Sequence, residues 1–314
     1  MPAPRAQQVS CEATPLYHCL SRCVRRAFLC GQDRLTGMNF DHRKPWLVDR
    51  MRELAAIFAI DICAYAVMSN HFHLILRIDR DRAASWTDDQ VADRYARLFP
   101  QTVRRSRKLP EPAQAILHAV WRHRLWNLSW FMRCLNEAIA RRANREDGCT
   151  GRFWEGRFRS QALLDEGALL ACMSYIDLNP IRASLSQTLG DSAFTSIHER
   201  LSRTPTTLVP FVGEGDTGAM PLPLGRRDYV ELLEWTVAAW RETQRQAVPP
   251  QVQATLNRLD LHADRFADTV RDYTRRFFTM VGHVHRITVE SRRRGYHRCP
   301  GISGARRMYR RTAA

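Results

Sequence analysis

Lysine is almost missing from this chain of 314 residues, although basic residues are abundant. Lys44 and Lys108 are the only lysines among 48 basic side chains, so guanidinium groups carry nearly all of the positive charge. Only 32 acidic residues oppose them, which leaves a formal net charge of +16. Guanidinium groups clamp phosphates bidentately and stack on bases. GC-rich coding can explain arginine in place of lysine but not the excess over acids, so the balance favours a nucleic-acid partner over a merely solubilising surface.

Cysteine pairs with metal-binding spacing and long apolar segments are missing as well. The nine cysteines are irregularly spaced and include no Cys-x-x-Cys pair, which argues against a disulfide framework and a zinc ribbon. Residues 1–8 lack the apolar segment of a signal peptide, and no apolar run approaches the length of a membrane span. We therefore expect a soluble protein of the reducing cytoplasm, associated with the nucleoid if the host is a bacterium.

Two apolar runs enclose a short polar turn in the first third of the chain. Residues 62–68 and 74–78 flank Ser69-Asn70, whose short side chains suit a turn, so the segment predicts two strands. Side chains alternate along a strand, and His71 and His73 should therefore leave one face while Phe72 packs behind them. Two neutral imidazoles so placed can hold a divalent metal. The same pattern also suits two ordinary histidines at a strand edge.

The elements before this pair complete half of a known arrangement. Residues 16–29 mix apolar and basic positions, which favours a first strand that runs into a loop. Apolar residues recur at intervals of three and four over 44–60, which predicts an amphipathic helix. The order strand, helix, strand, strand is that of the first half of a ferredoxin-like split β-α-β fold.

The middle of the chain is less regular until residue 125. Residues 79–123 are polar and poorly periodic, with one short helical piece at 88–98, and their basic cluster suits a solvated loop or a DNA-contacting insert equally. From Leu125 the apolar positions predict a long helix. At 148–164 glycines, aromatic residues and arginines are interleaved before an apolar finish, which is typical of a glycine-rich turn entering a fourth strand. The three aromatic residues there suit base stacking, but at least two are expected in the core.

A helix with two polar side chains on one face follows. Asp165 can cap it, and Asn179-Pro180 should end it. Tyr175 and Asn179 are four residues apart, so on a helix a phenol hydroxyl and a carboxamide oxygen reach the same point. A residue before proline is biased out of the helical region, which leaves the reach of Asn179 open.

Three motifs in this order resemble those of a known family. They are Met68-Ser-Asn-His-Phe-His-Leu-Ile-Leu, Gly151-Arg-Phe-Trp-Glu-Gly-Arg-Phe and Tyr175-Ile-Asp-Leu-Asn-Pro-Ile-Arg-Ala. Over roughly residues 14–200 the combination resembles the single-tyrosine HUH transposases, especially the REP-associated tyrosine transposases. The resemblance implies an α+β fold with a ferredoxin-like core, in which an antiparallel sheet carries helices on one face.

The resemblance also implies roles for individual residues. Tyr175 would be the nucleophile, and His71, His73 and the Asn179 oxygen would hold Mg²⁺ or Mn²⁺, although the ligand types also suit zinc. Attack of the Tyr175 oxygen on phosphorus would give a 5′-phosphotyrosine intermediate beside a DNA hairpin, and a second 3′-hydroxyl would reverse the step and join strands. Contacts to nucleic acid are expected from Arg22, Arg25, Arg26, Arg152, Arg157, Arg159 and Arg182.

Two other functions stay open on the sequence. A replication initiator or relaxase would use the same chemistry, but the lone tyrosine and its Tyr-x-x-x-Asn-Pro context disfavour it. A domesticated DNA-binding protein or repressor would bind without cleavage, and binding alone would not require the histidine pair together with Tyr175 and Asn179. Single-stranded or hairpin DNA is the expected partner, and homodimerisation is left open.

The last third of the chain changes in character. Residues 201–225 are rich in proline and glycine and predict a linker, and residues 226–290 predict a small helical appendage. Residues 291–314 hold eight arginines and no acidic residue. We expect this tail to be disordered alone and to become ordered on DNA.

Overall fold

A five-stranded sheet forms the centre of the computed structural model, which describes residues 8–24, 29–32, 37–202, 207–214, 220–241 and 247–310. The strand order is β2-β3-β1-β4-β5. The first four strands pair antiparallel, and β5 joins β4 in parallel. The strands are β1 (Leu16–Arg22), β2 (Ile60–Val67), β3 (His71–Ile78), β4 (Arg159–Leu163) and β5 (Met280–Val281).

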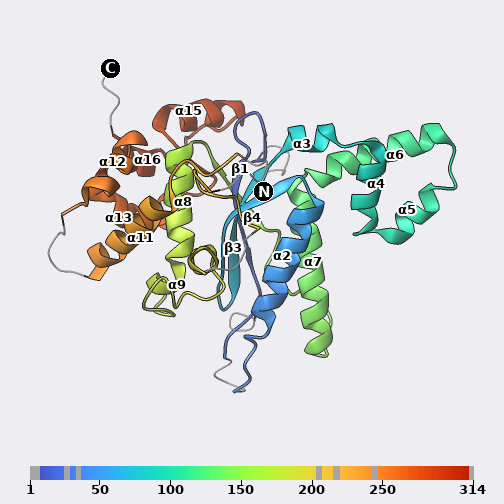
Figure 1. Cartoon of the computed structure of the whole chain (residues 1–314), viewed down its shortest axis with the longest axis horizontal. Helices are drawn as coiled ribbons and strands as arrows, with labels where there is room; N and C mark the ends of the chain where they lie inside the picture. The colour runs from blue at the N-terminus through green and yellow to red at the C-terminus, as the bar shows by residue number, and fades with distance from the viewer. Residues whose placement is uncertain are drawn as a thin grey trace.

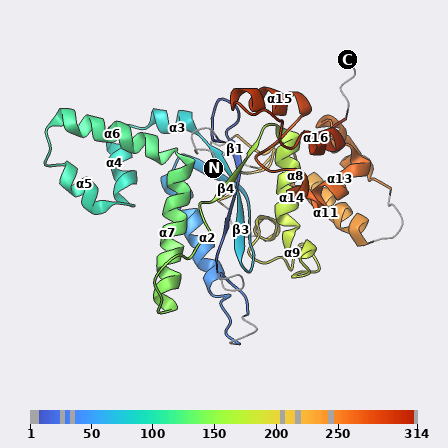
Figure 2. The ribbon, with the colours of Figure 1, turned by 180° about the vertical axis from the view of Figure 1, so that it is seen from behind.

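The connections of the first four strands are ferredoxin-like. Helix α2 (Arg43–Ile57) joins β1 to β2, and α7 (Leu128–Glu146) precedes β4, so two β-α-β halves interleave as the sequence predicts. Helices α2 and α7 lie together on one face of the sheet (Figures 1 and 2). The other face is also apolar, because β2 and β3 are buried along nearly their whole length. Helix α8 (Glu166–Asp177) and the C-terminal helices cover it (Figure 1).

Helix α8 begins where the sequence predicts and ends slightly early. The Asp165 carboxylate accepts a hydrogen bond from the Ala168 amide at 2.8 Å, which caps the first turn. The helix ends at Asp177, and a separate short helix, α9 (Asn179–Arg182), starts at the residue before Pro180. Proline lacks an amide hydrogen and fits the first turn of a helix, so a new helical start at Asn179 is the favoured outcome.

The short helix expected at residues 88–98 is confirmed as Asp88–Ala96, but the irregular structure expected over the rest of residues 79–123 is wrong. The segment folds into four helices that project from the sheet as an arm (Figure 1). Local signals explain them: Thr87 and Gln90 form a capping box, and Pro100 and Pro112 occupy first turns. The helices are α3 (Arg80–Ser85), α4 (Asp88–Ala96), α5 (Pro100–Ser106) and α6 (Glu111–Leu125).

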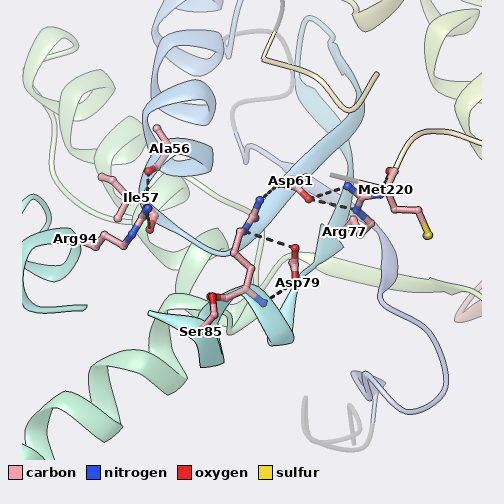
Figure 3. A network of polar contacts seen from close by, with 9 residues as sticks. Ala56, Ile57, Asp61, Arg77, Asp79, Ser85, Arg94 and Met220 are labelled. Atoms are coloured by element: carbon pink, nitrogen blue, oxygen red, sulfur yellow. Dashed lines mark hydrogen bonds and ion pairs between the residues drawn. The ribbon is translucent and has the colours of Figure 1, made fainter. Parts of the chain in front are cut away.

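Polar contacts at the root of the arm tie it to the core (Figure 3). The Asp61 carboxylate on β2 accepts hydrogen bonds from Arg77 on β3 and pairs with Arg82 on α3 at 2.8 Å. Arg94 on α4 donates to the carbonyl oxygens of Ala56 and Ile57, which satisfies the free end of α2. These contacts fix the arm both to the sheet and to a core helix.

The C-terminal third packs on the core. The Val209 amide donates to the Ile62 carbonyl at 2.9 Å, so the part of the proline-rich segment around Val209 contacts the outer edge of β2. The expected disorder of the arginine-rich tail is wrong for residues 291–310, because helices continue there and Arg294 is buried against Glu290 at 2.6 Å. The remaining helices are α10 (Ser196–Leu201), α11 (Arg226–Arg241), α12 (Pro250–Arg258), α13 (Ala263–Arg271), α14 (Tyr273–Arg276), α15 (Val284–Arg293) and α16 (Ile302–Met308).

The structure also bears on disulfide bonds and on membrane-spanning helices. The described residues include all nine cysteines, and none of them forms a disulfide bond. Within the part of the chain that the structure describes, no helix has both the length and the apolar character needed to cross a membrane.

Candidate functional site

The two histidines of the turn-and-strand motif lie side by side on β3. Their ring centroids are 4.9 Å apart with an interplanar angle of 85°. His71, the first residue of the strand, is partly exposed, whereas His73 is 1% exposed. Both rings leave the face of the sheet that α8 covers, and Phe72 packs against Trp154 on the other side, as the alternation of side chains requires.

Tyr175 and Asn179 reach the same place from α8 and α9. The Tyr175 ring meets the His73 ring edge to face at 5.4 Å between centroids. The Asn179 oxygen accepts a hydrogen bond from Arg182 at 2.8 Å, and the Arg182 guanidinium lies 5.4 Å from the centre of the Tyr175 ring. Tyr175 and Asn179 are almost fully buried. Two segments about a hundred positions apart in the chain thus bring the predicted residues into one cluster.

Burial sets the charge state of this cluster. Burial lowers the pKa of His71 to about 4, and the nearby charges of Arg22 and Arg182 act in the same direction. Burial also holds the pKa of His73 well below its usual value. Both imidazoles are therefore neutral near pH 7, the form that binds metals. Burial raises the pKa of Tyr175, and the positive charge of Arg182 opposes that rise in part.

His18 on β1 is a member of the cluster that sequence reasoning missed. The strand register places it on the same face as His73, and its Nε2 atom lies 2.9 Å from the His73 Nδ1 atom. Its Nδ1 atom lies 3.2 Å from the Gln161 Oε1 atom on β4. His18 is a buried polar residue between the buried Tyr17 and Cys19, which is a signal, but the pairing of β1 with β3 is needed to interpret it.

The C-terminal third also contributes to the cluster. The Tyr273 ring on α14 stacks on the Tyr175 ring at 4.9 Å with an interplanar angle of 16°. The Tyr273 hydroxyl donates to the Gln161 Oε1 atom at 2.8 Å. The region expected as an appendage therefore forms one wall of the candidate site.

The arginines predicted to bind nucleic acid occupy different positions. Arg22 ends β1 opposite His71 and is exposed. Arg157 and Arg159 are exposed and, with His18 and Tyr273, line a cavity of about 470 Å³ beside the cluster. Arg152 is exposed, and so is Arg182, although its guanidinium group contacts Asn179 and the Tyr175 ring. Arg25 and Arg26 fall outside the described residues. The three aromatic residues of this glycine-rich segment are all buried, as expected for core residues.

The polar atoms of the cluster suit a divalent metal. The Nε2 atom of His73 is buried and has no hydrogen-bond partner among the described residues. The described part of the chain contains no group of three or more His, Cys, Asp and Glu side chains able to hold a metal. A metal here would therefore bind two imidazoles and an amide oxygen, for which Asn179 is the candidate. Arg182 donates a hydrogen bond to that oxygen and occupies one of its lone pairs.

Comparisons with known proteins add one solved structure. No family model matches the chain, and no curated protein matches it significantly. A structure described as a REP-associated tyrosine transposase bound to a REP hairpin matches with a TM-score of 0.37 and 15% sequence identity, covering 67% of this chain and 93% of that one. The assignment of the fold rests on the strand order and connections described above.

Proposed function

We propose that this protein is a metal-dependent endonuclease and strand transferase for single-stranded DNA, with Tyr175 as its nucleophile. The observation that supports the proposal is the convergence of a histidine pair, a tyrosine and an asparagine in one buried cluster. Arginine at the rim and a net charge of +16 suit a polyanionic substrate. The solved transposase that the chain resembles was bound to a REP hairpin, which makes hairpin-flanked ends the substrate to test first.

In the proposed reaction the Tyr175 oxygen forms a bond to phosphorus as the bond to the 3′ oxygen breaks. The phenol proton is released to solvent, and the departing oxygen takes up a proton to become a 3′-hydroxyl. The product is a 5′-phosphotyrosine, and attack by another 3′-hydroxyl reverses the step and joins strands. His71, His73 and Asn179 would hold Mg²⁺ or Mn²⁺, which when bound would offset charge on the phosphate oxygens.

Arg182 has two functions in this proposal. Its positive charge beside the Tyr175 ring favours the phenolate, which the raised pKa of the buried phenol otherwise disfavours. Its hydrogen bond to Asn179 also occupies the amide oxygen that would bind the metal. Tyr175 is only 3% exposed, so side chains that cover it, Arg182 among them, must shift before a phosphate can reach the phenol.

The same features favour a second candidate function, DNA binding without cleavage. Tyr175 is buried away from substrate, and Asn179 is hydrogen-bonded to Arg182. Both features also suit a protein that binds DNA without cleaving it. Covalent chemistry separates the two candidates, because binding alone leaves no bond between protein and DNA.

The test uses single-stranded DNA from the ends that flank the gene of this protein, labelled at its 3′ end. With Mn²⁺ we expect a labelled adduct that survives denaturation, because the 5′-phosphotyrosine retains the downstream strand. Chelation of the metal should abolish the adduct. The Tyr175→Phe variant should form none, and Tyr296→Phe, a matched change outside the cluster, should form as much as wild type. No adduct from wild type, or equal amounts from Tyr175→Phe, would contradict the proposal.

A further inference from the structure

A chain of hydrogen bonds runs from Phe278, in the C-terminal third of the protein, to His73. The donor and the acceptor of each bond can be assigned in turn, starting from the Phe278 carbonyl oxygen. The Phe278 carbonyl oxygen can only accept, so the Gln161 amide nitrogen donates to it, at 3.1 Å. That contact fixes the orientation of the amide group and turns the Gln161 Oε1 atom toward His18. The Tyr273 hydroxyl donates to the same oxygen and uses its second lone pair.

The orientation of Gln161 determines which nitrogen of His18 carries a proton. Because the Oε1 atom accepts, the His18 Nδ1 atom must donate. His18 is 6% exposed and both of its ring nitrogens contact uncharged side chains, so the neutral ring is the favoured form and its Nε2 atom is an acceptor. The His73 Nδ1 atom, 2.9 Å away, therefore carries the proton of that contact. What remains on His73 is the Nε2 lone pair, which is buried and unpartnered.

The tautomer of His71 is fixed in the same way, but by the neighbouring residue Asn70. Its Nδ1 atom lies 2.6 Å from the Asn70 Oδ1 atom, an acceptor, which leaves the Nε2 atom of His71 as the lone-pair nitrogen. Both rings of the pair thus have the same tautomer, although one is held by the adjacent residue and the other by residues of β1 and β4.

We propose that His18 and Gln161 are positioning residues that hold His73 in the Nδ1–H tautomer and so present its Nε2 lone pair to a divalent cation. This inference rests on the proposed metal site. It implies that residues 273–279, through Tyr273 and Phe278, support the metal site from the C-terminal third. Hydrogen bonds of this kind to a metal-ligating histidine typically change metal affinity by about 10- to 100-fold.

The first test reads the tautomers directly in the metal-free full-length protein. Long-range ¹H–¹⁵N correlations of histidine-labelled protein separate protonated from lone-pair ring nitrogens, and the His73→Gln variant assigns the signals. We expect His73 to show a protonated Nδ1 atom and a lone-pair Nε2 atom. The opposite tautomer in wild type would overturn the proposal, whatever the activity of the protein.

The second test measures Mn²⁺ affinity by calorimetry in the absence of DNA. His18→Leu removes the acceptor for His73 and should weaken Mn²⁺ binding by about 10- to 100-fold. His18→Gln restores an acceptor oxygen near the lost nitrogen and should bind within about threefold of wild type. His198→Leu, the same change at a histidine whose ring contacts the Gly190 carbonyl, is the matched control and should not change affinity. Equal binding by His18→Leu and wild type would overturn the proposal, and so would absence of rescue by His18→Gln.

The results of these two tests distinguish failure of the positioning role from failure of the proposed transferase function. If wild type binds Mn²⁺ with the expected tautomer but forms no DNA adduct, the transferase proposal fails and the positioning role stands. If wild type binds no Mn²⁺, the positioning role fails with the metal site. If His18→Leu does not fold, the wild-type tautomer and the His18→Gln affinity still decide the question.

Discussion

Substitution of Asp177 should reveal how α8 is held over the sheet. Asp177 lies between Tyr175 and Asn179 in sequence but on the opposite side of the helix, because residues two apart on a helix project in nearly opposite directions. The carboxylate is fully buried and accepts hydrogen bonds from Ser196 Oγ at 2.5 Å, the Ile197 amide at 2.9 Å and Tyr229 Oη at 2.6 Å. It anchors the helix that carries the candidate nucleophile to α10 and α11.

The loss of stability on removing the Asp177 carboxylate can be worked out from the hydrogen-bond donors that it accepts from. In Asp177→Ala the Ser196 hydroxyl keeps its contact with the Tyr65 carbonyl, but the Ile197 amide and the Tyr229 hydroxyl lose their partner. Each buried donor left unpaired costs about 1–3 kcal/mol, so the two donors together should lower the free energy of unfolding by about 2–6 kcal/mol. Tyr229→Phe removes one donor to the carboxylate and should cost about 1.5–3 kcal/mol.

The double variant supplies the sharper test. Without Asp177 the Tyr229 hydroxyl is an unpaired buried donor that itself destabilises the protein. Adding Tyr229→Phe to Asp177→Ala should therefore lower the free energy of unfolding by less than about 1 kcal/mol more. Urea unfolding of the full-length chain, followed by circular dichroism, measures all three variants. A loss below about 1 kcal/mol for Asp177→Ala, or strictly additive losses, would refute the reasoning.

Two further predictions concern DNA. His71→Ala should abolish adduct formation but keep hairpin binding, measured by fluorescence anisotropy, within about tenfold of wild type, since phosphate contacts supply most of the affinity; an equal loss of both would point to a structural histidine pair. Arg157→Ala should weaken binding of single-stranded DNA and reduce the salt dependence of log K by about 0.7 if the side chain neutralises one phosphate. The control is Arg133→Ala, which changes an exposed arginine on α7 and should leave the slope of log K against log salt unchanged. If Arg157→Ala also leaves the slope unchanged, Arg157 at the cavity rim does not contact a DNA phosphate.

Local patterns were sufficient for much of the core. The alternation around His71 and His73, the turn at Ser69-Asn70 and the periodicity of α2, α7 and α8 correctly predicted the order of elements and the common face of the histidine pair. These features depend on neighbours in sequence, because the periods of strands and helices determine which side chains share a face.

The same reasoning failed where short elements depend on tertiary contacts. The arm at residues 80–125 is helical although its periodicity is weak, because caps and stacking such as that of Tyr95 on Trp121 stabilise short helices. The arginine-rich segment is folded because Glu290, which precedes it, pairs with Arg293 and Arg294. A count of charges from residue 291 onward could not include that partner.

The amino-acid pattern alone predicts the histidine pair, the cap and face of the helix that carries Tyr175, and a basic charge that favours a nucleic-acid partner. The fold adds the residues that meet them, which are His18 from β1, Gln161 from β4 and Tyr273 from the C-terminal third. The physical reason is strand register and helix docking. A proton on one nitrogen of His73 is set by a chain of contacts whose members lie up to 260 positions apart in the sequence, between His18 and Phe278, and no local pattern encodes that pairing.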